Sequence, residues 1–296
     1  MMQMIYVACP GNYATGGIEL LHQLCCEIRS YVPAKIWYMN GNNSPHMPQY
    51  NMYGNEYEKS DFAPSATKDT VIFPEIWGPM AAEYEHGVVY WESVDNYISR
   101  FPIGRIFPES TIHLVQSEYA RRFVSEYIST NVIEVTDYLN SDFLKVYPQT
   151  ERKPYVLFNP AKGMEFTRKI IDQMPDITFV PLEGLSREKL IELMRTSKVY
   201  IDFGNHPGKD RLPREAAMCG CCVIVGRAGS AKFFRDVPIP ERYKLDFDLE
   251  QIEPVIRRTL NTYTVDDFDG YRIAIRDERK RFEEGVRNFL KKLEGI

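Results

Sequence analysis

Short apolar runs and amphipathic stretches alternate along this chain, and each pair predicts one strand followed by one helix. The clearest example begins with the apolar run Val199–Phe203, which predicts a strand buried on both faces. Leu212–Cys219 then predicts a short helix with Pro213 in its first turn, where the missing N–H costs nothing. A second buried strand follows at Cys222–Val225. This order is a βαβ unit, which requires parallel strands joined by a right-handed crossover.

Polar and glycine residues fill the loop between this strand and this helix. The loop carries Gly204, Asn205, His206, Gly208, Lys209, Asp210 and Arg211. In open parallel sheets, ligands bind beyond the carboxyl ends of the strands, which is where the loop begins. Because basic side chains and a helix N-terminus meet there, the loop predicts a site for a ligand that bears phosphate.

The same alternation runs through the whole chain and restarts once. In the first part, strands are predicted at residues 4–8, 34–39, 70–73, 87–91, 112–115 and 131–135. The stretch Tyr147–Pro154 is polar, carries two prolines and shows no periodicity, so it predicts a linker. After it the pattern returns, with strands predicted at 155–158 and 177–181. We therefore predict an α/β protein of two domains, residues 1–149 and 150–296, since one core seldom serves a chain of this length.

Two features of the first half bear on function. Gly16 and Gly17 follow the first strand and open a helix, as in phosphate-binding turns, but their spacing is not GxGxxG. A second interpretation is that these glycines only let the helix pack close to the sheet. Glu75, Glu92 and Asp95 follow two later strands at the same edge of the sheet, so each is a candidate to take a proton from an acceptor hydroxyl.

Net charge, cysteine spacing and the length of the apolar runs limit the classes of protein to which this chain can belong. The 296 residues carry a net charge of −5, whereas a nucleic-acid-binding domain usually has a basic face. The six cysteines lack the spacing of a disulfide framework or of a zinc site, which agrees with a reducing compartment. No apolar run reaches the roughly 18 residues of a membrane span, and because the chain enters its first predicted strand directly, we expect no signal peptide. We therefore expect a cytoplasmic protein.

Two further segments stand out from the pattern. Residues 40–68 are polar and rich in Asn, Pro and Tyr, and they predict a long loop that is either functional or disordered. The helical C-terminal region carries an apolar stripe among charged residues, formed by Phe282, Val286, Phe289 and Leu293. We predict that this stripe packs on the protein itself rather than on a membrane.

Three stretches form a set that is typical of one family. Gly16–Glu19 follows the first strand, Lys162–Gly163 follows the first strand of the second half, and Arg214–Ile224 closes the βαβ loop. Together they resemble retaining glycosyltransferases of the GT-B class, close to the large family 4 (group 1). The family pattern E-A-x-A-x-G-x-P-V-I stands here with Ala217 and Met218 in swapped order and with Cys222 in place of proline. The resemblance implies two Rossmann-like domains that face each other across a cleft. The first would be the acceptor side, and the second would bind the nucleotide sugar, with a C-terminal helix packing back.

The resemblance also implies roles for individual residues. Lys162 would neutralise the diphosphate of the donor, and Glu215 would accept hydrogen bonds from the ribose hydroxyls, kept ionised by the dipole at the N-terminal end of its helix. Glu92 stands where many members have a histidine near the sugar and would fill that role. Arg211 or Lys209 would supply a second cation. The remaining donor-binding positions implied are the glycines Gly16, Gly17, Gly163 and Gly208.

We therefore predict an enzyme in which Glu92, Lys162 and Arg211 act in catalysis. It would move a sugar from a nucleotide-sugar donor to a glycan or lipid-linked acceptor in polysaccharide biosynthesis, with retention as the resemblance implies. Since protein cations would stabilise the charge on the leaving diphosphate, neither a metal nor a cofactor is needed. Peripheral membrane association and the oligomeric state stay open.

Two departures from the family keep other functions open. Pro207 stands where the family has the first of two glutamates bracketing seven residues, and the arginine that precedes the Lys162–Gly163 pair in the family is missing. A non-catalytic subunit that binds a nucleotide sugar would fit the first departure. A sugar-nucleotide epimerase on the same fold is a further alternative.

Overall fold

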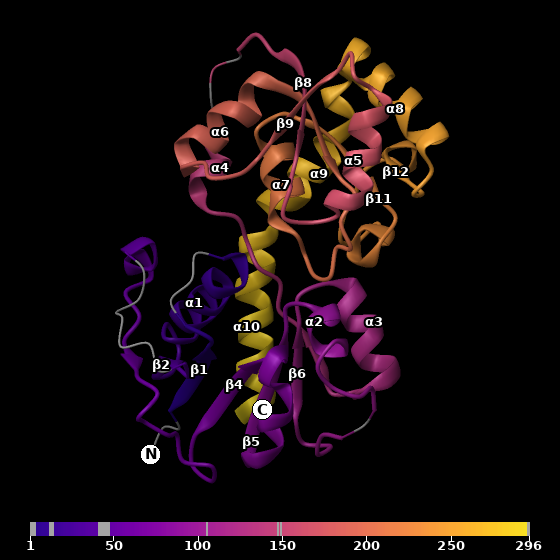
Figure 1. Ribbon diagram of the computed structural model, residues 1–296. Coiled ribbons are helices and arrows are strands. Elements are labelled where there is room, and N and C mark those ends of the chain that lie inside the picture. The colour runs from indigo at the N-terminus through magenta and orange to yellow at the C-terminus, as the bar shows by residue number, and fades with distance from the viewer. Residues whose placement is uncertain are drawn as a thin grey trace. The chain divides into compact units, whose positions relative to one another are not determined.

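The computed structural model describes residues 4–11, 15–40, 48–104, 106–146, 148 and 150–294 (Figure 1). Their contacts divide the chain into two units. The N-terminal unit comprises the described residues within Met1–Tyr138, Pro207–Lys209 and Arg279–Ile296, and the C-terminal unit comprises those within Leu139–His206 and Asp210–Glu278. The final helix therefore belongs, apart from its first residue, to the N-terminal unit.

Among the described residues, seven parallel strands form the sheet of the N-terminal unit, in the order β3-β2-β1-β4-β5-β6-β7. They are β1 (Ile5–Cys9), β2 (Ala34–Tyr38), β3 (Tyr57–Glu58), β4 (Thr70–Pro74), β5 (His86–Trp91), β6 (Ile112–Val115) and β7 (Val132–Glu134). The central strands β1 and β4 are buried along their whole length, as expected of a parallel sheet covered on both faces. The order reverses between β1 and β4, and such a switch point marks the ligand-binding edge of an open sheet.

The helical segments of this unit pack on the two faces of the sheet and form a hydrophobic core with each face. They are α1 (Gly16–Ile28), η1 (Pro48–Tyr53), η2 (Glu75–Glu83), α2 (Val94–Ile98), α3 (Glu118–Tyr127) and α10 (Glu278–Glu294). Val7 lies in a core with α1 and α10, whereas the next residue, Ala8, lies in a core with Phe123 of α3, because successive strand side chains point to opposite faces. The predicted C-terminal stripe packs in the first of these cores, where Phe282 and Phe289 are completely buried. This confirms that the stripe packs on the protein.

Among the described residues, the C-terminal unit has five parallel strands in the order β12-β11-β10-β8-β9. They are β8 (Lys153–Phe158), β9 (Thr178–Pro181), β10 (Ser197–Asp202), β11 (Cys222–Gly226) and β12 (Lys244–Leu245). The helical segments are α4 (Ser141–Leu144), α5 (Met164–Gln173), α6 (Arg187–Thr196), α7 (Arg211–Met218), η3 (Gly229–Lys232), η4 (Glu241–Tyr243), α8 (Leu249–Thr262), η5 (Val265–Phe268) and α9 (Asp269–Arg276). The switch point of this sheet lies between β8 and β10.

The predicted α/β architecture with two Rossmann-like sheets is confirmed. The expectation for residues 40–68 is wrong in part, because Tyr57–Glu58 pairs with β2 as an edge strand and Pro48–Tyr53 forms a 3-10 turn. A two-residue edge strand is held by backbone hydrogen bonds and needs no apolar run, so the pattern gives no sign of it. Residues 41–47 of that segment lie outside the described residues. No helix among the residues described above is both long and apolar enough to cross a bilayer.

A buried ion pair joins α7 to the start of α10. Arg214 is completely buried, and its Nη1 atom donates to Oε2 of Glu278 at 2.8 Å. Its Nε atom donates at 3.1 Å to the backbone oxygen of Asp210, the residue before α7. Removing one partner of a buried ion pair strongly lowers the free energy of unfolding, because the remaining charge then stays buried without a counterion.

We expect Arg214→Met to lower the free energy of unfolding by about 3–5 kcal/mol, because Glu278 loses its buried guanidinium partner. The matched control is Arg257→Met, whose guanidinium pairs with Asp176 at the surface. Solvent and salt screen that pair, so the control should change the unfolding midpoint little. Urea denaturation of both variants measures the difference. An Arg214→Met protein as stable as the control would contradict the role given to the buried pair.

Candidate functional site

The candidate site of the C-terminal unit lies at the carboxyl edge of its sheet, at the switch point. From β8 the chain continues to β9 on one side, whereas β10 and the strands after it lie on the other side. The turns that leave β8 and β10 are therefore neighbours, and ligands of open α/β sheets bind where such turns diverge. Lys162 and Gly163 belong to the first turn, and residues 203–210 form the second. The loop predicted from the sequence thus begins at the switch point.

The two turns touch through their backbones. Gly163 precedes α5 with a φ of 61°, a conformation that favours glycine. A Cβ atom on Gly163 would lie 2.4 Å from the backbone oxygen of Phe203, so another residue would force the second turn to move. This contact places the neighbouring Lys162 against the loop that follows β10.

Asp202 anchors that loop at the end of β10. Its buried carboxylate accepts hydrogen bonds from the hydroxyl of Tyr200 at 2.9 Å and from the backbone amide of Gly204 at 3.0 Å. The imidazole of His206 lies beside it, with Nε2 3.6 Å from Oδ1 of Asp202 and 3.2 Å from its backbone oxygen. His206 is 1% exposed and has a φ of 47°. Non-glycine residues held in this conformation gather at functional loops.

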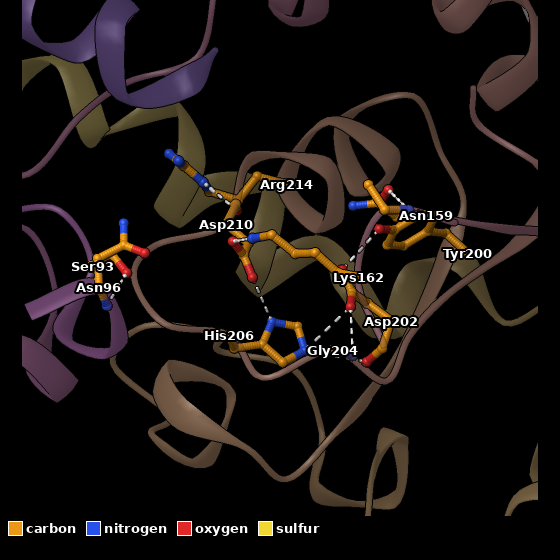
Figure 2. Close-up of polar contacts among 11 residues, drawn as sticks. Ser93, Asn96, Asn159, Lys162, Tyr200, Asp202, Gly204, His206, Asp210 and Arg214 are labelled. Atoms are coloured by element: carbon orange, nitrogen blue, oxygen red, sulfur yellow. Dashed lines mark hydrogen bonds and ion pairs between the residues drawn. The ribbon is translucent and has the colours of Figure 1, made fainter. Parts of the chain in front are cut away.

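Asp210 contacts two cations at once (Figure 2). Nδ1 of His206 lies 3.0 Å from one carboxylate oxygen, and the Lys162 ammonium forms an ion pair with the other. Together with Asp202, these residues form a connected set of charges that we call the switch-point cluster: Lys162, Asp202, His206 and Asp210. All four belong to the C-terminal unit.

The surroundings of this cluster determine its charge. Burial would lower the pKa of His206, but the hydrogen bond to Asp210 and the charge of Asp202 outweigh it and raise the pKa above its ordinary value. Burial would raise the pKa of Asp210, yet the contacts with His206 and Lys162 lower it. Both shifts favour the charged forms, a protonated His206 and an ionised Asp210, so the contacts within the cluster pair opposite charges.

Three members of the cluster lie close enough together to ligate a cation: Asp202, His206 and Asp210. In this structure the two carboxylates face opposite nitrogens of the same ring. One metal ion binds one ring nitrogen, whereas an imidazolium carries an N–H on both. The cluster therefore fits a protonated histidine between two carboxylates.

Helix α7 presents two of the predicted donor-binding residues. Arg211 is its first residue and Glu215 lies one turn later on the same face, and both are half-buried. From the sequence, Glu215 is predicted at the N-terminal end of this helix, where the dipole would keep it ionised. That detail is wrong, because Glu215 is the fifth residue of α7 and the dipole falls off within the first turn. Its predicted role toward the ribose stays a prediction.

The N-terminal unit has an edge of the same kind between β1 and β4. Gly16 and Gly17 open α1 after β1, and Glu75 follows β4 directly. Glu92 follows the adjacent strand β5. A Cβ atom on Gly17 would lie 2.3 Å from Oε2 of Glu92, so this glycine leaves room for the carboxylate. The role predicted for the amides of these glycines toward a diphosphate stays a prediction.

Glu75 holds the loop that carries Glu92. Its side chain is 2% exposed; Oε2 accepts from the backbone amide of Glu92 at 3.0 Å, and Oε1 accepts from Nδ2 of Asn96 at 3.3 Å. Burial raises the pKa of Glu75 to about 7. The third candidate, Asp95, accepts from the hydroxyl of Tyr119 at 3.2 Å. Glu75 therefore acts on the position of Glu92 rather than presenting its own carboxylate to a ligand.

The segment Pro207–Lys209 packs with the N-terminal unit. A Cβ atom on Gly208 would lie 1.9 Å from the backbone oxygen of Glu92. Lys209 is 8% exposed, and its Nζ atom donates to the hydroxyl of Thr136 at 2.7 Å. This contact of Lys209 lies within the N-terminal unit. The donor-binding roles of Gly208 and Lys209 stay predictions.

The two aspartates of the cluster have no predicted role of their own. One signal was present: Asp202, His206 and Asp210 recur at intervals of four residues. The interval alone does not bring them together, because Asp202 ends β10 and the other two lie in the loop after it rather than on one helix face. Cys219, Cys221 and Cys222 are buried, and burial raises the pKa of each thiol.

No protein-family model and no curated protein matches this chain. Solved structures match it over its full length. HepE from Anabaena, in complex with UDP and glucose, has a TM-score of 0.65 at 10% identity and covers 100% of both chains. Sucrose-phosphate synthase from Thermosynechococcus elongatus has a TM-score of 0.62 at 13% identity and covers 99% of this chain and 98% of its own.

WaaG, a glycosyltransferase involved in lipopolysaccharide biosynthesis, has a TM-score of 0.60 at 11% identity and covers 99% of this chain and 100% of its own. At these identities the likeness shows the fold. The chain therefore has the GT-B fold of these glycosyltransferases, as the sequence analysis predicts.

The raised pKa of Glu75 predicts a pH-dependent stability. The folded protein keeps the Glu75 proton up to about pH 7, whereas the unfolded chain loses it near the ordinary value of 4.5. The free energy of unfolding should therefore fall as the pH rises through this window. Glu75→Gln keeps the shape of the side chain without titrating. The variant should gain about 2–3 kcal/mol relative to wild type between pH 5 and pH 8.

Urea denaturation at pH 5, 6, 7 and 8 measures this gain. Glu165→Gln, which removes an exposed carboxylate from α5, is the matched control and supplies the baseline. A difference in the free energy of unfolding between wild type and Glu75→Gln that stays constant over this range would contradict a raised pKa of Glu75 in the folded protein.

Proposed function

We propose that this protein is a glycosyltransferase that moves a sugar from a nucleotide-sugar donor to an acceptor. The observation that carries the proposal is the position of Lys162, at the carboxyl edge and switch point of a parallel sheet within a GT-B fold. Nucleotides bind at such edges, and an ammonium there suits a diphosphate. The bound UDP and glucose of HepE support the same class of ligand for this chain.

The diphosphate of the donor is the leaving group of the transfer. The bond between C1 of the sugar and the β-phosphate oxygen breaks, and a bond forms between C1 and an acceptor oxygen. The proton of the acceptor hydroxyl passes to the released diphosphate or to a carboxylate. Because negative charge grows on the diphosphate as its bond breaks, cations there stabilise the transition state most. We assign this role to Lys162 and Arg211, and the ribose contact to Glu215.

Glu92 is the residue that we assign to the acceptor. Its backbone amide is held by Glu75 and its carboxylate lies against Gly17, so the group has the fixed position that a general base needs. The acceptor class that we propose is a glycan or a lipid-linked glycan. Retention of configuration and independence from metal ions follow the resemblance to family 4 and are part of the proposal, as is a cytoplasmic location.

A second candidate function is a non-catalytic subunit that binds a nucleotide sugar. Pro207 favours it, because this residue stands where the family has a glutamate and offers no carboxylate. Product analysis with UDP-glucose, GDP-mannose and related donors distinguishes the two functions. Sugar transfer that is lost in Glu92→Gln supports the enzyme, whereas donor binding without turnover on any acceptor supports the subunit.

Binding measurements test the assignments in the C-terminal unit. A thermal-shift screen against UDP, GDP, dTDP and CDP selects the nucleotide, and isothermal titration then measures its affinity and that of inorganic pyrophosphate. Lys162→Met should weaken both by about 10- to 100-fold, the equivalent of one charge-assisted hydrogen bond of about 1.5–3 kcal/mol. Glu215→Gln should weaken the nucleotide about 10-fold and leave pyrophosphate unchanged, because pyrophosphate has no ribose.

The matched control is Lys169→Met, which removes an ammonium that pairs with Glu165 at the surface of α5. It should bind both ligands as wild type does. Wild-type affinity in Lys162→Met would remove Lys162 from the site. A loss of pyrophosphate affinity in Glu215→Gln would show that Glu215 does not act through the ribose.

A further inference from the structure

Asp210 uses its carboxylate in an unusual way for the residue before a helix. An aspartate in this position normally accepts hydrogen bonds from the first amides of the helix. Among the described residues, however, no amide of α7 donates to the Asp210 side chain. One of its oxygens pairs with Lys162 and the other faces Nδ1 of His206 at 3.0 Å. The carboxylate is therefore held by two cations instead of capping α7.

The surroundings of Lys162 resemble an anion site that is already filled. A carboxylate oxygen and a phosphate oxygen are both strong acceptors for an ammonium group. The Lys162 side chain is 35% exposed, whereas that of Asp210 is 14% exposed, so solvent and ligands reach the pair from the lysine side. The negative charge of Asp210 opposes the positive charge of Lys162, so the pair attracts an arriving diphosphate less than Lys162 alone would.

We propose that Asp210 is an internal counterion that takes the place of the donor's diphosphate on Lys162 in the ligand-free protein and gives it up when the donor binds. The inference rests on the proposed function, because it concerns the same site. When Lys162 turns to a phosphate oxygen, Asp210 keeps its contact with His206, which Asp202 holds in place. The carboxylate thus loses one cation and retains the other.

This arrangement has a consequence for turnover. The nucleoside diphosphate left after transfer is the product that Lys162 would otherwise retain. A carboxylate that competes for the same ammonium lowers the affinity for this product and favours its release, a step that limits many enzymes. Asp210 is therefore a positioning residue, which acts on the ligand through Lys162.

Isothermal titration with inorganic pyrophosphate tests the proposal. Asp210→Asn keeps the shape of the side chain and removes its charge, so it should bind pyrophosphate at least 5-fold more tightly than wild type. In a Lys162→Met background, the same substitution should change the affinity by less than about 2-fold, because the phosphate is no longer drawn toward Asp210. Asp172→Asn, which removes an exposed carboxylate from α5, is the matched control and should have no effect.

A second variant, Asp210→Ser, tests the same effect in case Asp210→Asn does not fold. Asp210→Ser also removes the charge and can cap α7, so it should tighten pyrophosphate binding in the same direction. Unchanged or weaker binding in both variants would overturn the proposal. An equal gain with and without Lys162 would also overturn it, because the effect would then be one of overall charge.

A different result would contradict the proposed function: Lys162→Met would then bind nucleotide and pyrophosphate as tightly as wild type does. If wild type binds pyrophosphate too weakly to measure, binding by Asp210→Asn supports the inference, and its absence in both Asp210 variants counts against it.

Discussion

The backbone contact between Gly163 and Phe203 is the constraint on which the candidate site depends. It lets the turn after β8 contact the turn after β10 directly, at the switch point of the C-terminal sheet. Lys162 comes to lie beside Asp210 for this reason. The sheet determines the edge at which a ligand binds, and this contact determines which side chains meet there.

The loop between β10 and α7 is held at both of its ends. Asp202 is fixed by Tyr200 and by the amide of Gly204, and the backbone of Asp210 is fixed by the buried Arg214. Such support keeps charged groups in position without a bound ligand, which is what a preorganised site requires. The balance of charge inside the cluster follows from the same residues, because a buried carboxylate is stable only beside a cation.

The fold could be predicted from the sequence more completely than the site. Buried strands of a parallel sheet produce plain apolar runs, as at Val199–Phe203, and glycine and proline mark the turns between them. The order of the strands within a sheet produces no comparable pattern in the sequence. That β8 lies next to β10, and so brings Lys162 to the loop, depends on packing between distant segments.

Packing between distant segments also explains two other contacts that could not be predicted from the sequence. Arg214 is buried because Glu278, 64 positions away, supplies its counterion. Glu75 reaches the amide of Glu92 across two neighbouring strands. Both contacts depend on tertiary structure, and neither residue type signals them.

A crystal structure with the nucleoside diphosphate that stabilises the protein most would test the central claim most directly. The account predicts that the diphosphate contacts the ammonium of Lys162, that the ribose hydroxyls contact Glu215, and that the Lys162–Asp210 pair has opened. A nucleotide bound elsewhere, with Lys162 still paired to Asp210, would contradict it.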